Sequence, residues 1–140
     1  MSVATIVDAG PLVAFLNRED AHHHWVKEQL AQLTRPLLTC EAALAEAWHL
    51  LGKAGSAQAA ILELMRRDTL RVAFELGREV PSVERLIQRY ASVPMSLADA
   101  CLVRMTEIHS GSRVLTLDSD FHIYRRHGRQ IISLIIPEHD

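Results

Sequence analysis

Two aspartates stand directly after short runs of apolar and β-branched residues. Asp8 ends the run ATIVD, and Asp118 ends the run RVLTLD. Both runs are typical of buried strands, and the parallel strands of one sheet end at a common edge, where ligands bind in open α/β sheets. Two carboxylates at one edge repel each other unless a cation lies between them. Such oxygen ligands suit magnesium or manganese better than zinc, so the pair predicts a site for Mg²⁺ or Mn²⁺.

Strands that alternate with helices would have to hold these aspartates. Apolar runs predict strands over residues 4–8, 37–39, 70–76, 113–118 and 130–137. Capping residues and apolar periodicity predict helices from Pro11, over 21–34 after Asp20, after Thr39 as far as Gly52 or Gly55, from Ser56 to about Asp68, over 81–91, and from Ser96 to about His109. We therefore predict an α/β fold with three layers, α/β/α, and a central, mostly parallel sheet.

The size and composition of the chain indicate one domain over residues 1–140. The length of 140 residues is usual for one domain, and 49% of the residues are hydrophobic. No run approaches the roughly 18 consecutive apolar residues of a membrane span, and the N-terminus lacks the features of a secretion signal. We therefore expect a cytoplasmic protein with no membrane partner. Cys40 and Cys101 have no metal-binding spacing and are predicted to be small core residues.

The distribution of charge is more informative than the total. A net charge of −2 does not by itself indicate a nucleic-acid partner. All but two of the 15 basic residues are arginine, however, and arginine is the side chain best shaped for bidentate contact with phosphate. Several of these arginines are clustered in the sequence. A local basic surface beside an acidic pocket would give a total charge near zero.

Four segments, in this order, resemble the PIN-domain nucleases, a family that includes the toxin ribonucleases of VapBC-type toxin–antitoxin pairs. The segments are IVDAGPLVAFL, ALAEAWHLL, SLADACLV and LTLDSDF. The resemblance implies an α/β/α domain that hydrolyses RNA phosphodiester bonds with magnesium or manganese. The chain departs from the pattern at Ala9 and Gly10, because many relatives carry Ser or Thr directly after the first aspartate. A hydroxyl beside the metal is therefore missing.

The same resemblance assigns roles to individual residues. The positions that match the catalytic, metal-binding acids of the family are Asp8, Glu46, Asp99 and Asp118. Asp120 matches a common additional acid, which implies a further metal ligand, and Thr116 matches a hydroxyl beside the site. The four acids would hold one or two ions that orient a water molecule and offset the charge of the transition state. The resemblance also implies single-stranded or looped RNA as substrate, a homodimer, and a cognate antitoxin whose arginine would enter the acidic pocket.

Two of these acids also have a structural interpretation as helix caps. Asp8 precedes the helix predicted near Pro11 and could cap it. Asp99 follows Ser96 at the spacing of a capping box, with aspartate in place of the usual glutamate. The residues alone leave both roles open at Asp99, whereas the end of a buried strand favours a site role for Asp8.

The other acids differ in how well a structural role explains them. Asp118 and Asp120 could form the turn before FHIYRRHG, and for Asp120 this interpretation is as good as a direct role. Glu41 lies in the first turn of its helix, where the helix dipole favours an acid. Glu46 has no such explanation, because it lies on the rim of the apolar stripe, and a site role is favoured.

Arg125, Arg126 and Arg129 follow the last acids and are predicted to hold the backbone of the substrate. A solvated helix face is an equally good interpretation of these three residues. The run His22, His23 and His24 is different, because neighbours on a helix point about 100° apart and cannot converge on one ion. We interpret these histidines as a helix start with partly exposed rings.

Two other functions fit clustered acids. A catalytically silent module could use the acidic pocket to bind a partner. A receiver-like phosphoacceptor domain is also doubly wound, but that class typically needs a lysine opposite the acids. Only Lys27 and Lys53 occur, and neither follows a late strand. Metal-dependent RNA hydrolysis is therefore the first hypothesis.

Overall fold

A parallel sheet of five strands lies at the centre of the computed structural model, which describes residues 3–52 and 55–138. The strands lie in the order β3-β2-β1-β4-β7, and every neighbouring pair is parallel. Their bounds are β1 (Thr5–Val7), β2 (Leu37–Thr39), β3 (Leu70–Val72), β4 (Arg113–Leu115) and β7 (Leu134–Ile135). The predicted sheet is confirmed.

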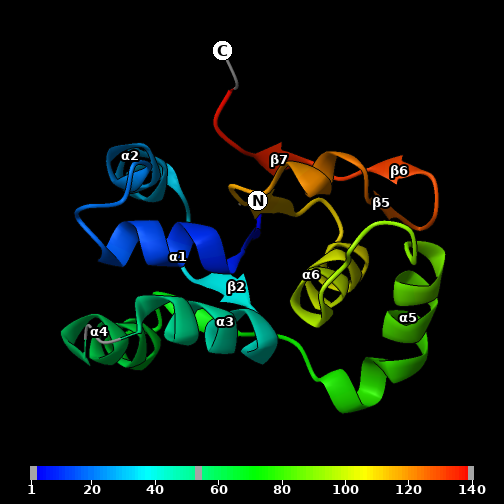
Figure 1. Ribbon diagram of the computed structural model, residues 1–140, viewed down its shortest axis with the longest axis horizontal. Coiled ribbons are helices and arrows are strands. Elements are labelled where there is room, and N and C mark those ends of the chain that lie inside the picture. The colour runs from blue at the N-terminus through cyan, green and yellow to red at the C-terminus, as the bar shows by residue number, and fades with distance from the viewer. Residues whose placement is uncertain (1–2, 53–54, 139–140) are drawn as a thin grey trace.

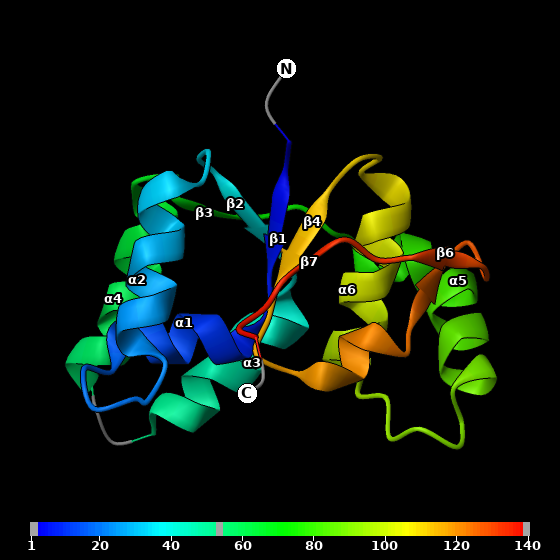
Figure 2. The same cartoon turned by 90° about the horizontal axis from the view of Figure 1, so that it is seen from above.

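Helices cover both faces of this sheet, as Figures 1 and 2 show. One face carries α1 (Ala9–Leu16), α2 (His23–Gln32) and α4 (Gly55–Arg66), and the other carries α5 (Leu76–Arg89) and α6 (Leu97–Ile108). Helix α3 (Glu41–Leu51) packs against both α1 and α6. The predicted α/β/α class is therefore confirmed. Among the described residues, no helix is both long and apolar enough to span a membrane.

Alternation along the short strands divides the core between the two faces. Ile6 and Val114 are partners in register and belong to the cluster packed under α5 and α6. Val7 and Leu115 point the opposite way, into a second cluster with Leu12 of α1. All five side chains are almost completely buried. The strands read as continuous apolar runs because both faces of the sheet are covered.

The order of the strands reverses at β1. Strands β2 and β3 lie on one side of β1, whereas β4 and β7 lie on the other. Where the order reverses in this way, the connections after neighbouring strands leave toward opposite faces and open a crevice at the carboxyl ends. Asp8 follows β1 directly, and Asp118 follows β4 after two further residues. Both aspartates therefore lie at the predicted edge.

Several predicted boundaries are wrong for local reasons. Thr39 does not cap α3, because it lies within β2 and its hydroxyl donates to the Val7 carbonyl at 2.9 Å. Cys40 is the N-cap residue instead and makes no side-chain hydrogen bond to the helix. The strand predicted over 70–76 ends at Val72, because α5 begins well before Pro81. A proline within a helix removes one backbone hydrogen bond, and the buried side chains of α5 offset that loss.

The end of the chain also differs from the prediction. The strand expected over 130–137 divides, and only Leu134–Ile135 joins the central sheet. Its first part, β6 (Gln130–Ile131), pairs antiparallel with β5 (Arg125–Arg126), which follows the short 3₁₀ helix η1 (Ser119–His122). Glycine at position 128, with a φ of +77°, allows the tight turn between β5 and β6. The two strands form a separate hairpin beside α5 and α6 (Figure 1).

Candidate active site

A chain of hydrogen bonds joins the ends of β1 and β4. The Asp8 carboxylate accepts from the Ala9 amide at 2.7 Å and from the Thr116 hydroxyl at 2.8 Å. The same hydroxyl oxygen accepts from the Asp118 amide at 3.0 Å. Asp8 therefore caps α1, as its structural interpretation predicted, and Thr116 lies beside it. The buried hydroxyl fixes the two strand ends to each other.

Asp8 is the most strongly perturbed acid at this edge. It is only 7% exposed, and burial raises its pKa to about 6. The charges of Asp99 and Glu46 raise the pKa further, whereas the hydrogen bonds from Thr116 and Ala9 lower it. The effect of desolvation on the pKa of Asp8 is therefore larger than the combined effect of the two hydrogen bonds. A cation beside Asp8 would therefore stabilise its buried, ionised carboxylate.

Asp99 enters the same edge from the first turn of α6. The Ser96 hydroxyl accepts from the Asp99 amide at 3.0 Å, which confirms the predicted helix cap. The Asp99 side chain is 7% exposed and accepts from the Tyr124 hydroxyl at 2.9 Å. Burial and the charge of Asp118 raise the pKa of Asp99, whereas hydrogen bonds from Tyr124 and Ser96 lower it. Asp99 thus combines a capping position with a carboxylate held toward the other acids.

Tyr124 is the residue of this site that the sequence did not indicate. It is completely buried, and its ring packs edge-on against Tyr90 and Phe121. The only signal in the sequence is an aromatic residue shortly after the last acids, and this pattern is common in cores. Burial and the neighbouring Asp99 carboxylate raise the pKa of Tyr124, so its hydroxyl remains a donor.

Tyr124→Phe is expected to destabilise the protein by about 1.5–3 kcal/mol at neutral pH, because hydrogen bonds to charged groups contribute about that much. The hydrogen bond stabilises ionised Asp99, so its loss raises the pKa of Asp99 further. The destabilisation should therefore shrink as the pH falls and Asp99 takes up a proton in both proteins. Urea unfolding at neutral and acidic pH measures the difference.

Tyr90→Phe is the matched control. The Tyr90 hydroxyl accepts from the Arg125 amide at 2.8 Å, and among the described residues it forms no hydrogen bond with a carboxylate. Its loss should cost a similar amount at both pH values. Equal pH dependence in the two variants would contradict the role assigned to Tyr124.

Glu46 reaches the site from α3. Its side chain is exposed, and its pKa is raised by partial desolvation and by the charges of Asp99 and Asp118. Glu41 lies in the first turn of the same helix. The carboxylate of Glu46 therefore lies near those of Asp99 and Asp118.

Asp118 and Asp120 belong to the turn that follows β4. The Asp118 carboxylate accepts from the Asp120 amide at 2.9 Å and caps η1, as the turn interpretation predicted. Both side chains are half-buried. Asp118 raises the pKa of Glu46 and of Asp99, which places its charge beside theirs. Asp118 therefore caps η1 while its charge lies close to those of Glu46 and Asp99.

The acids form a negatively charged group without a compensating cation. None of Asp8, Glu46, Asp99 and Asp118 forms an ion pair with arginine or lysine in the described part of the chain. Over residues 3–52 and 55–138, no three His, Cys, Asp or Glu side chains lie close enough together to hold an ion as they stand. The donors are hard oxygens with excess charge, which fits magnesium or manganese. Ligation would require the carboxylates to draw closer, and exposed Glu46 has room to move.

The arginines predicted to bind substrate do not meet these acids. Arg125 folds back and donates to the carbonyls of its own turn, including that of His122 at 2.7 Å. Arg126 donates to the Thr106 carbonyl at 2.9 Å, near the end of α6 opposite to Asp99. Arg129 is exposed. Two of the three arginines therefore hold backbone carbonyls.

The histidine run marks a helix start, as predicted. Helix α2 begins at His23, with His22 as the N-cap residue, and the Asp20 carboxylate accepts from the His22 amide at 2.8 Å. A ring nitrogen of His23 lies 2.8 Å from the Ala14 carbonyl oxygen. The rings of His22 and His24 are exposed. The helix itself starts two residues later than the sequence predicted.

Comparison with known proteins identifies the family of this chain. Residues 5–126, which contain all four acids, match the model of the PIN domain. Among solved structures, VapC20 of Mycobacterium tuberculosis, described as a Sarcin-Ricin loop cleaving toxin, is similar with a TM-score of 0.73 and 22% identity, over 84% of this chain and 92% of that chain. No curated protein matches. Because the matched region spans most of the sequence, the chain belongs to the PIN-domain family.

Proposed function

We propose that this protein is a Mg²⁺- or Mn²⁺-dependent endoribonuclease and the toxin of a toxin–antitoxin pair. The observation that carries the proposal is the proximity of four acids, from four separate segments, at the carboxyl edge of the sheet beside β1. The raised pKa values of Asp8, Glu46 and Asp99 and the lack of an ion-paired cation in the described residues support a cation site. The similar fold of VapC20, described as cleaving the Sarcin-Ricin loop, supports RNA as the substrate.

The proposed division of labour follows from the contacts. Asp8, Glu46, Asp99 and Asp118 would hold one or two ions, with Asp120 as a further ligand. A bound divalent ion would polarise the phosphate and lower the pKa of a coordinated water molecule. Thr116 orients Asp8, and Tyr124 orients Asp99. These two hydroxyls favour the ionised form of the buried carboxylates and fix their orientation.

The purified protein is expected to cleave RNA with magnesium or manganese, and a chelator should stop the reaction. Glu46→Gln should lower the cleavage rate about tenfold or more, because the amide is a weaker ligand for a hard cation. Glu41→Gln on the same helix is the matched control and should leave the rate unchanged. Gel analysis of labelled RNA after incubation with each metal measures these rates.

Equal rates for the two variants would remove Glu46 from the site. A folded parent that cleaves no RNA with either metal would contradict the nuclease and leave the alternative function, a catalytically silent module that binds a partner in the acidic pocket.

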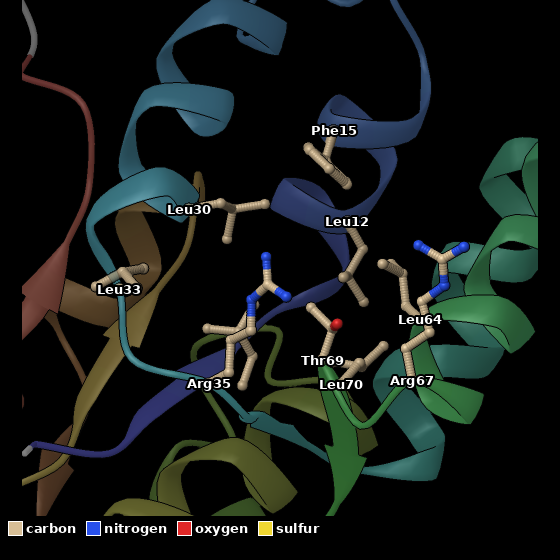
Figure 3. Close-up of a pocket in the computed structure, with 10 residues that line it drawn as sticks. Leu12, Phe15, Leu30, Leu33, Arg35, Leu64, Arg67, Thr69 and Leu70 are labelled. Carbon is tan, nitrogen blue, oxygen red and sulfur yellow. The ribbon is translucent and has the colours of Figure 1, made fainter.

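An apolar cavity supports the antitoxin part of the proposal. A cavity of about 180 Å³ lies between α1, α2 and α4, and Figure 3 shows Leu12, Leu30 and Leu64 around it. Arg35 and Arg67 line the same cavity with exposed side chains; Arg67 is paired with Glu63 at 2.9 Å, whereas Arg35 forms no ion pair among the described residues. Apolar walls with cationic groups at the rim complement an amphipathic segment that carries acidic residues. We propose this cavity as the anchor point of the antitoxin.

Co-expression with the product of an adjacent small reading frame is expected to yield a complex that suppresses cleavage. Arg35→Glu should weaken that complex about tenfold or more, because the reversed charge repels the acidic residues of the partner. Arg18→Glu, in the turn between α1 and α2, is the control and should behave as the parent. Titration of the partner into the cleavage reaction measures both affinities. If the two proteins purify separately and the partner does not change the cleavage rate on mixing, the toxin assignment is wrong and the nuclease proposal remains.

Three further parts of the proposal come from the sequence, and one of them, the homodimer, is implied by the family resemblance. We propose that residues 1–140 form a single domain, that the protein is a homodimer, and that it acts in the cytoplasm. The mass measured by light scattering tests the dimer directly.

A further inference from the structure

A second polar groove lies away from the acids, where α5, α6 and the β5–β6 hairpin meet. Its volume is about 600 Å³. The charged and titratable side chains that line it are Arg85, Arg89, Arg104, Glu107 and His127. The substrate-binding arginines predicted from the sequence do not line this groove.

The positive charge of the groove is only partly neutralised. Arg104 is paired with Glu79 at 2.9 Å and with Glu107 at 3.1 Å. Arg85 and Arg89 form no ion pair among the residues that the structure describes. They are four residues apart on α5, so their side chains emerge from one face about 5–6 Å apart at Cβ. Two free cations at this spacing can contact successive phosphates of one strand.

Arg89 is held in place before any ligand arrives. Its guanidinium donates to the Gly128 carbonyl at 2.6 Å and lies 5.7 Å from the centre of the Tyr90 ring. A Cβ atom at position 128 would lie 3.2 Å from a guanidinium nitrogen of Arg89, so glycine permits the close approach. An ordinary solvated arginine would not be fixed by the backbone of another element. The remaining N–H groups of Arg89 are available to an anion.

Aromatic side chains connect this groove to the acidic site. Tyr90 follows Arg89, and its ring packs edge-on against Tyr124 with 5.1 Å between ring centres. The Tyr124 hydroxyl donates to Asp99. Along α6, Glu107 in the groove is eight residues beyond Asp99, a rise of about 12 Å. The groove is therefore within reach of an RNA strand whose reacting phosphate lies at the acids.

We propose that this groove binds backbone phosphates of the RNA substrate, on one side of the bond that is cleaved, through Arg85 and Arg89. The inference rests on the proposed function for the identity of the strand. It assigns RNA binding to α5 and the hairpin, whereas the acids perform the cleavage. Contacts of this kind position the strand without reading its sequence.

The test measures RNA binding separately from cleavage. A labelled single-stranded oligouridylate of roughly 15 nucleotides is titrated with the parent and with Arg85→Gln/Arg89→Gln in chelator, where the proposed nuclease is inactive. The double variant should bind the RNA about tenfold more weakly. The slope of log K against log salt concentration should be less steep by about 1.4, because each lost phosphate contact on a single strand accounts for about 0.7. Arg18→Gln/Lys27→Gln is the matched control, because these two cations are also exposed and form no ion pair among the described residues, and thermal melts establish that all three proteins are folded.

Each outcome bears on one proposal. Unchanged binding in the α5 variant, an equal loss in the Arg18→Gln/Lys27→Gln control, or no binding by the parent would overturn the groove. Cleavage at the parent rate with unchanged binding would remove the groove and leave the nuclease standing. Binding that depends on Arg85 and Arg89, without cleavage in magnesium or manganese, would keep the groove and contradict the nuclease.

Discussion

Asp8→Asn is expected to lower the rate of RNA cleavage by at least about a hundredfold. Asp8 is buried at the carboxyl edge of the sheet, and its position is fixed by Ala9 and Thr116. Asparagine keeps the size and an oxygen that can accept from the Ala9 amide, but it removes the negative charge that would hold the metal. A divalent ion contributes several kcal/mol to phosphate chemistry, and each 1.36 kcal/mol corresponds to about a factor of ten. Initial rates with saturating magnesium measure the loss.

Asp20→Asn is the control for this variant. Asp20 also accepts a backbone amide near a helix start, but it lies in the turn before α2 and outside the acidic group. Its substitution should leave cleavage unchanged. Parent-like cleavage by Asp8→Asn, with a normal thermal melt, would show that the site lies elsewhere.

The second large effect is a dependence of stability on pH in the absence of metal. The pKa of Asp8 is about 6 in the folded protein and 3.8 for an ordinary aspartate. The folded state therefore binds this proton more tightly than the unfolded chain does. Stability should be highest below pH of about 4 and should fall as the pH rises toward about 6, by about 3 kcal/mol from Asp8 alone. Raised pKa values of Asp99 and Glu46 act in the same direction.

Asp8→Asn should remove most of this dependence and should be more stable than the parent in chelator at neutral pH. Saturating magnesium should reverse that order, because a ligand that binds only the folded state stabilises the protein with the higher affinity more. Urea unfolding in chelator from about pH 4 to about pH 8 measures the first effect, with Asp20→Asn as the control. A parent that gains stability over this range would contradict the uncompensated burial of Asp8.

Local residue patterns were enough to predict where the acids lie. Asp8 and Asp118 follow strands that are buried by helices on both faces of the sheet, and Ser96 is the N-cap residue of α6. Such signals depend on neighbours within one or two turns, so they survive without knowledge of the fold. The edge shared by the two aspartates followed from parallel pairing, which the alternation of strands and helices predicts.

Boundaries were harder to predict where packing outweighs a local rule. Thr39 has the chemistry of a helix cap, but its hydroxyl bonds to Val7 in the neighbouring strand. Pro81 is typical of a helix start, yet α5 begins five residues earlier at Leu76, and Glu79 in this first part of the helix pairs with Arg104 of α6 at 2.9 Å. In both places contacts between elements decided against the local preference.

The sequence by itself therefore determined which acids end the strands and cap the helices, because those roles depend on adjacent residues. Only the tertiary structure decided which side chains hydrogen-bond to these acids. The bond from Tyr124 to Asp99 joins the hairpin segment to α6, and the bond from Thr116 to Asp8 joins β4 to β1. It also decided that Arg125 holds its own backbone, whereas Arg89 lines a groove. These contacts link residues far apart in the chain, and their geometry exists only after the sheet and helices have packed.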